Sequence, residues 1–131
     1  MSVEELFAKQ RLMTLMGAQL TRVSRGEVDI SLPFRDDLGQ QNGALHAGTV
    51  ASIADTAAGL AALTMMPEGS GVVSVEFKIN FLSSATGAHF VAKGRVTRAG
   101  KTLTVATADV IADGEKVVAT MLATMMRRDG R

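Results

Sequence analysis

The spacing of apolar residues predicts two helical segments, one at the start of the chain and one near its middle. Residues 2–16 place apolar side chains at helical intervals, with Ser2 as an N-terminal cap and Gly17 as a stop. Residues 45–66 are rich in alanine and apolar on nearly all sides, and Pro67 follows them. A helix that is apolar all round is usually buried, so this second segment predicts a long central helix.

Alternation of apolar and polar residues predicts strands over the rest of the chain. Residues 19–32 predict two strands joined by a turn at 25–27, and a loop follows over 33–43. Residues 72–82 alternate most regularly, with Ser74, Glu76, Lys78 and Asn80 on one face and apolar side chains, including Val75 and Phe77, on the other. The remaining predicted elements are strands over 89–97, 102–111 and 116–126, turns at 83–87, 98–101 and Asp113-Gly114, and a charged tail over 127–131.

The order of elements predicts an α+β fold: a helix, two strands, a long helix and four strands joined by short turns. Short turns favour an antiparallel sheet built from consecutive hairpins, which would curl around the apolar helix. A chain of 131 residues fits a single domain, spanning residues 1–131. The strand over 72–82 would make a poor bare edge, so we expect an oligomer with the polar face of this strand near its two-fold axis.

Composition excludes several classes of function. The net charge of +1 and an aromatic content of 4% predict neither a nucleic-acid nor an acidic-membrane surface. There is no cysteine, only two histidines, and no P-loop or GxGxxG motif, so we expect no metal and no cofactor. The N-terminus does not resemble a signal peptide, and no apolar run would span a membrane, so we expect a cytoplasmic protein.

Asp55 is the outstanding candidate for chemistry, because a helix seldom places a carboxylate among core positions without a reason. Its neighbours one turn away include Ala51, Ala58 and Gly59, which are small and leave room beside the carboxylate. Asp55 could act as a general base on water or as a direct nucleophile that forms a mixed anhydride. The alternative is a structural aspartate held by local hydrogen bonds.

The start of the central helix is the second candidate. Unpaired N–H groups and the helix dipole favour an oxyanion there, and Gly48 permits close approach to the backbone. His46 could polarise a substrate, orient the loop or donate to a backbone carbonyl. Gln40 and Asn42 could position water or substrate, or could simply form a polar turn.

Three segments resemble hotdog-fold acyl-CoA thioesterases of the PaaI-type branch, the relatives of phenylacetyl-CoA thioesterase. The first is LHAGTVASIADTAAGLAA at 45–62, which is similar to the HGG…(D/E) signature. The second is GVVSVEFKINFLSSATG at 71–87, and the third is the pair of closing hairpins at 94–126. The resemblance covers about residues 39–126. It implies a hotdog fold that hydrolyses an acyl-CoA, as a homodimer with two interface sites that is often doubled into a dimer of dimers.

The resemblance also assigns roles to individual residues. It implies that Asp55 is the catalytic carboxylate and that Ala47 and Gly48 occupy the paired glycines whose backbone N–H holds the thioester oxygen. Gln40 occupies a position that is Asn or Gln in relatives, and Ser74 a serine position seen in some of them. Ala47 departs from the signature, and its methyl group would narrow the approach of the substrate carbonyl.

Basic residues should lie at the mouth of a site that binds the phosphates of CoA. The candidates are Arg98, Lys101, Arg127 and Arg128. A non-catalytic acyl-CoA binding or sensing module on the same fold is the alternative function. A hotdog dehydratase is a third, but the chain lacks the His-Phe-Pro-Gly type pattern of that family. The sequence leaves open whether the acyl group is aromatic, medium-chain or hydroxylated.

Overall fold

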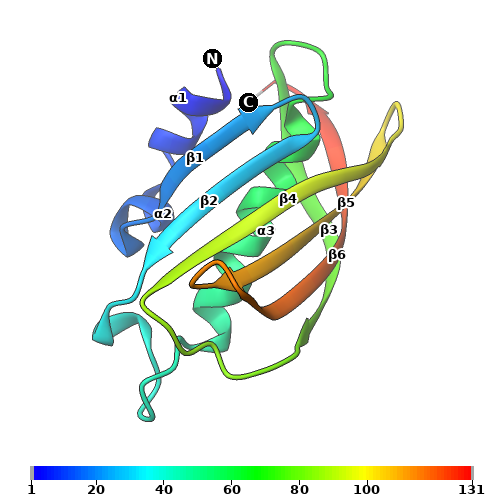
Figure 1. Ribbon diagram of the computed structural model, residues 1–131. Helices are drawn as coiled ribbons and strands as arrows, with labels where there is room; N and C mark the ends of the chain where they lie inside the picture. The colour runs from blue at the N-terminus through cyan, green and yellow to red at the C-terminus, as the bar shows by residue number, and fades with distance from the viewer. Residues whose placement is uncertain (1, 131) are drawn as a thin grey trace.

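A computed structural model describes residues 2–130 as a curved antiparallel sheet wrapped around one long helix (Figure 1). The helices are α1 (Val3–Ala8), α2 (Arg11–Met16), the short 3-10 helix η1 (Asp36–Leu38) and α3 (Ala47–Leu63). The strands are β1 (Gln19–Ser24), β2 (Glu27–Pro33), β3 (Ser70–Phe81), β4 (His89–Ala99), β5 (Leu103–Ala112) and β6 (Lys116–Asp129). The α+β architecture predicted from the sequence is confirmed.

The sheet has the strand order β1-β2-β4-β5-β6-β3, and every neighbouring pair is antiparallel. The expectation of four consecutive hairpins is wrong at its first step, because β3 pairs with β6 and not with β4. The chain crosses from one edge of the sheet to its middle between β3 and β4. Alternation along a strand identifies the strand but not its partner, which is set by contacts between distant segments.

Helix α3 lies across the concave face of the sheet and supplies most of the core on that side (Figure 1). Its close approach to β4 depends on Gly94, because a Cβ at that position would overlap the carbonyl oxygen and carbon of Ala57. The buried stretch of α3 from Ala57 to Leu63 explains the apolar composition on all sides of the predicted helix. The helix is shorter than the predicted span of 45–66 because His46 caps its start and it ends at Leu63.

The first helical segment is two short helices, not one. Ser2 and Glu5 form the capping box of α1, so the predicted N-terminal cap is confirmed. The chain then leaves the helical conformation at Gln10, whose backbone is extended (φ −79°, ψ 103°), and α2 ends at Gly17 in the left-handed region (φ 78°). Before this break, Leu6 of α1 packs on the core and lines a cavity together with Leu60 and Leu63 of α3.

A β-bulge in β3 reverses the faces of the predicted strand. Residues opposite each other in an antiparallel ladder point to the same side of the sheet. Ser74 lies opposite the buried Met125, and Phe77 lies opposite the buried Ala123. Ser74 and Phe77 are three positions apart along β3, whereas their partners are two positions apart along β6. Val75 is the extra residue at the register shift, so Ser74 and Phe77 both face α3.

This bulge corrects the predicted alternation over residues 72–82. Ser74 was expected on the polar face with Glu76, Lys78 and Asn80, but it lies on the opposite face from them. No break in the hydrophobic pattern marks the bulge in the sequence. Of these four polar residues, only Ser74 therefore faces the helix.

The ends of two strands also differ from prediction. β4 continues to Ala99, into the predicted turn, and β6 continues to Asp129, so most of the predicted charged tail is strand. Because β6 pairs with β3 along this extension, Arg128 is held opposite Gly71. The strand extension places basic side chains next to the start of β3.

Candidate active site

Asp55 and Ser74 form a hydrogen-bonded pair between the middle of α3 and the start of β3. The Ser74 hydroxyl donates to Asp55 Oδ1 over 2.6 Å. This contact depends on the bulge, which turns Ser74 towards the helix. The hydroxyl fixes one carboxylate oxygen of Asp55 and leaves the other without a hydrogen-bond partner within residues 2–130. A carboxylate held in this way is oriented for proton transfer or for attack.

A cavity of about 160 Å³ opens beside this pair. Gly59 lies on its wall, one turn of α3 beyond Asp55, so the space expected from small neighbouring residues is present. The residues that complete the wall come from the break between α1 and α2, from α3, and from strands β3 and β6: Gln10, Thr56, Leu60, Val72 and Met125. The break between α1 and α2 brings Gln10 to this cavity.

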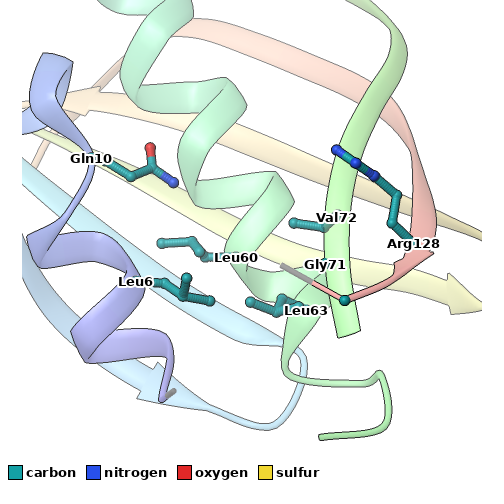
Figure 2. Close-up of a pocket in the computed structure, with 8 residues that line it drawn as sticks. Leu6, Gln10, Leu60, Leu63, Gly71, Val72 and Arg128 are labelled. Carbon is teal, nitrogen blue, oxygen red and sulfur yellow. The ribbon is translucent and has the colours of Figure 1, made fainter. Parts of the chain in front are cut away.

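A second cavity of about 190 Å³ adjoins the first, because both are lined by Gln10, Leu60 and Val72 (Figure 2). Its walls are mainly apolar, with Leu6 from α1 and Leu63 from α3 converging on the same space (Figure 2). The Asp55 carboxylate therefore opens towards a space that can accept an apolar group. We call the first of these the Asp55 cavity and the second its apolar extension.

The start of α3 forms a separate donor site. His46 caps the helix, and its Nδ1 accepts from the Gly48 N–H over 2.8 Å. An accepting Nδ1 leaves the proton of the neutral ring on Nε2, which can then act as a donor. A Cβ at position 48 would lie 3.1 Å from Nδ1, so glycine allows this cap to close. His46 thus organises the start of the helix, which was one of its predicted roles.

The backbone N–H of Ala47 is the donor that the cap leaves open. The N–H groups of Thr49 and Val50 both donate to the His46 carbonyl, while no acceptor for the Ala47 N–H is found among residues 2–130. Ala47 is also exposed. Of the two predicted oxyanion donors, Ala47 is available in this structure and Gly48 is occupied by the histidine cap.

A third cavity, of about 370 Å³, lies against the start of α3. We call it the N-terminal cavity. Gln40 and Ala47 line it together with the segment after β3, and its other lining residues are Leu45, Val50, Phe81, Ser83, Ser84, Ala85 and Val118. Backbone hydrogen bonds hold the loop in place, since the N–H of Gln40 donates to Ala44 and the N–H of Leu45 to Ala85.

The other predicted binding residues are distributed unevenly. Asn42 accepts from the backbone N–H of Ala44 over 3.4 Å, which is a turn contact. Arg98 and Lys101 lie at the far end of β4 and in the turn after it, and neither lines any of these three cavities. Arg128 lines the apolar extension, and Arg127 pairs with Asp129. The structure brings Arg128, rather than Arg98 or Lys101, to a cavity.

Within residues 2–130 no group of three or more His, Cys, Asp or Glu side chains could hold a metal ion. In the same part of the chain, no helix combines the length and apolar character needed to cross a membrane. Sequence patterns did not single out Gln10 or Ser83, which lie in irregular backbone. Only their positions on the cavities identify them.

A curved antiparallel sheet around a long helix, with a carboxylate in the helix, defines the hotdog fold of thioesterases. Residues 42–119 match the family described as the Thioesterase superfamily, and the chain belongs to it. The crystal structure of a thioesterase family protein from Silicibacter pomeroyi superimposes with a TM-score of 0.94 at 43% identity, over 98% of this chain and 96% of that chain.

More distant similarities agree. The PaaI protein of the E. coli phenylacetic acid degradation operon has a TM-score of 0.88 at 20% identity, over 96% of this chain and 90% of that one, and shows the same fold. "Putative esterase SSO2140" of Saccharolobus solfataricus is 30% identical over 105 residues, which cover 79% of this chain and 74% of that protein. The predicted family and fold are confirmed, and membership supports thioester hydrolysis as the type of reaction.

Proposed function

We propose that this protein hydrolyses acyl-CoA thioesters at a site shared by two copies of the chain. The observation that supports it is the division of the catalytic groups along α3. Asp55 and its cavity lie eight residues beyond the open N–H of Ala47, which is roughly 12 Å along a helix. One thioester group cannot contact both within one chain, so a second copy must supply one of them.

Strand β3 has the properties of the surface that joins the two copies. It is an edge strand of the sheet. Its side chains Val75, Phe77 and Phe81 are 54%, 43% and 48% exposed, although the last two face the same side as α3. An unpaired edge with exposed apolar side chains favours pairing with another strand.

A two-fold axis through such a pair would complete the site. When two copies of β3 pair antiparallel, the end of one strand lies beside the start of the other. Phe81 lines the N-terminal cavity, whereas Val72 and Ser74 line the Asp55 cavity. The pairing would therefore place the N-terminal cavity of one copy against the Asp55 cavity of its partner.

The chemistry follows from these groups. The thioester oxygen would accept from the Ala47 N–H of one copy, where the helix dipole favours negative charge. Asp55 of the other copy either takes a proton from water, whose oxygen attacks the carbonyl carbon, or attacks that carbon itself. In both routes the C–S bond breaks. The departing CoA sulfur takes up the proton held by Asp55 in the first route and a proton from solvent in the second, and ends as a thiol. The anhydride of the second route is then hydrolysed by water.

The relatives support hydrolysis but leave the acyl group open. The phenylacetic acid degradation operon named for the E. coli structure makes arylacetyl groups worth testing. The apolar extension beside Asp55, lined by Leu6, Leu60 and Leu63, would receive the acyl group. We place the reaction in the cytoplasm, as expected from the sequence.

A panel of CoA thioesters tests this function. Acetyl-, octanoyl-, phenylacetyl- and hydroxyphenylacetyl-CoA are incubated with the purified protein, and released thiol is measured with a chromogenic thiol reagent. We expect catalytic turnover of at least one of them. Tight binding of an acyl-CoA without thiol release would instead favour the non-catalytic binding module.

Light scattering tests the shared site separately. We expect a dimer, or a dimer of dimers, at micromolar concentration. A monomer that turns over acyl-CoA would contradict the division of the site between copies while leaving the activity intact.

A further inference from the structure

Ser83 has a buried hydroxyl that the protein itself does not satisfy. It lies just after β3, on the wall of the N-terminal cavity that also contains Gln40 and Ala47. Its Oγ is shielded from solvent and has no hydrogen-bond partner, alone among the buried side-chain oxygens and nitrogens of residues 2–130. The neighbouring Ser84 lines the same cavity but is exposed to solvent.

A hydroxyl in this state costs stability. Removing a polar group from water without a compensating hydrogen bond is unfavourable, and natural proteins satisfy nearly all such groups. A serine retained here is therefore explained if something outside the folded chain provides the partner. The cavity beside Ser83 offers space for that partner, within reach of a rotation about the serine side-chain bond.

We propose that Ser83 binds the thiol half of the substrate, by a hydrogen bond to an amide of the pantetheine arm. This inference rests on the proposed hydrolysis of acyl-CoA. With the thioester oxygen at the Ala47 N–H, one half of the substrate enters the N-terminal cavity and the other half enters the Asp55 cavity of the partner copy. Ser83 then acts in substrate binding, without touching the reacting atoms.

The two cavities differ in the polarity of their walls, and this difference assigns the acyl half of the substrate to one cavity and the thiol half to the other. Leucine and valine side chains form most of the side-chain wall of the apolar extension, which suits an acyl group, and Gln10 and Arg128 also line it. The N-terminal cavity combines apolar walls with the Gln40 amide and the hydroxyls of Ser83 and Ser84. A pantetheine arm has the same alternation, with two amides separated by short hydrocarbon segments.

Three thioesters of one acyl group test the assignment: the CoA thioester, the N-acetylcysteamine thioester, which keeps one amide, and the ethanethiol thioester, which has none. We expect Ser83→Ala to lower kcat/KM about tenfold for an amide-containing thioester, the size of one lost hydrogen bond. The ethanethiol thioester should be hydrolysed as by the wild type. Thr86→Ala is the control, because Thr86 is exposed, lies in the same segment after β3 and lines none of the three cavities, and it should change neither rate.

Thermal unfolding of Ser83→Ala distinguishes a binding serine from a structural one, because loss of a structural serine would lower Tm. Because Ser83→Ala removes an unsatisfied polar group, its Tm should equal or exceed that of the wild type. A lower Tm would mean that the folded oligomer satisfies the hydroxyl, and would overturn the proposal. Equal losses on all three thioesters would also overturn it, since Ser83 would then act on the thioester or the acyl group.

Titration with free CoA separates this inference from the proposed hydrolysis. CoA contains both amides and no thioester, so its binding by calorimetry does not require turnover. Weaker CoA binding by Ser83→Ala than by Thr86→Ala supports the assignment even if no thioester is hydrolysed. Unchanged CoA binding by Ser83→Ala, in a wild-type protein that does bind CoA, would overturn it. A wild-type protein that neither binds CoA nor hydrolyses its thioesters would overturn both proposals.

Discussion

The start and the middle of α3 differ in what they offer a substrate. At the start, the histidine cap occupies one backbone donor and leaves the Ala47 N–H open, with no charged side chain on the adjoining cavity. In the middle, the helix presents the Asp55 carboxylate, held by Ser74, beside a largely apolar space. The start of α3 is suited to stabilise a negative charge that develops on a substrate oxygen. The middle of α3 instead supplies a negatively charged carboxylate.

This difference explains why a single rigid helix can hold both groups without bringing them together. An open N–H belongs at a helix start, where backbone donors are unpaired, whereas a carboxylate in mid-helix must project sideways into its own cavity. The two groups meet only if a symmetric partner reverses the direction of the helix. Each of the following changes tests one side of this comparison.

The largest effect should come from Asp55→Asn. The amide is nearly isosteric and can still accept from Ser74, but it lacks the anionic oxygen that either mechanism requires. We expect kcat to fall on the order of 10²–10⁴-fold with fold and oligomer intact. Asp109→Asn is the control, because Asp109 accepts from Thr120 over the same 2.6 Å on the other face of the sheet. If Asp55→Asn retains wild-type turnover, the catalytic assignment is wrong.

Ala47→Pro removes the open N–H at the start of the helix. Proline is well tolerated at the first helical position, and His46 before it already has extended backbone (φ −62°, ψ 143°). We expect kcat to fall about 10²–10³-fold, as for the loss of an oxyanion donor. Ala47→Gly keeps the N–H and removes the methyl group, so it should preserve activity or broaden the acyl range. Full activity in Ala47→Pro would contradict the donor assignment.

Mixing these two variants sharpens the comparison. In a hybrid dimer of Asp55→Asn and Ala47→Pro, one shared site has both defects and the other has neither. Random reassembly of equal amounts should restore about one quarter of wild-type activity, because half of the dimers are hybrids with one intact site. No recovery, in dimers shown to have exchanged subunits, would place both groups in the same copy.

Ser74→Ala should have a smaller effect. It removes the hydrogen bond that orients Asp55 but leaves the carboxylate in place. We expect kcat to fall up to about tenfold, the size of one hydrogen bond, with KM little changed. Thr120→Val breaks the equivalent bond to Asp109 and should leave kinetics unaltered. An equal fall in both variants would indicate a general loss of stability.

Gly59→Ala should have the smallest effect, and it should affect only the Asp55 cavity and the acyl group that enters it. A Cβ there would lie 3.9 Å from Met125 Sδ, an ordinary contact, so folding should be preserved. The added methyl group occupies space in the Asp55 cavity, and we expect a loss of roughly a few-fold in kcat/KM for bulky acyl groups and none for acetyl. A uniform loss would show that the acyl group does not enter this cavity.

Sequence patterns predicted the long helix, the position of all six strands and Asp55 as a carboxylate beside small residues. They failed where the outcome depended on contacts between distant segments. At the break at Gln10 the chain leaves the helical conformation while Leu6 of α1 packs on the distant core, and no proline or glycine marks the break. The pairing of β3 with β6 likewise leaves no local trace.

The sequence by itself determined which chemical groups are present and in which elements they lie, because helical and strand periodicities are local properties of the chain. The tertiary structure decided which of these groups meet. One extra residue in β3, Val75, turns Ser74 from the predicted outer face to Asp55, and the rise of α3 separates Asp55 from Ala47. A single inserted position reverses every face that follows it, so only the register against β6 determines this contact.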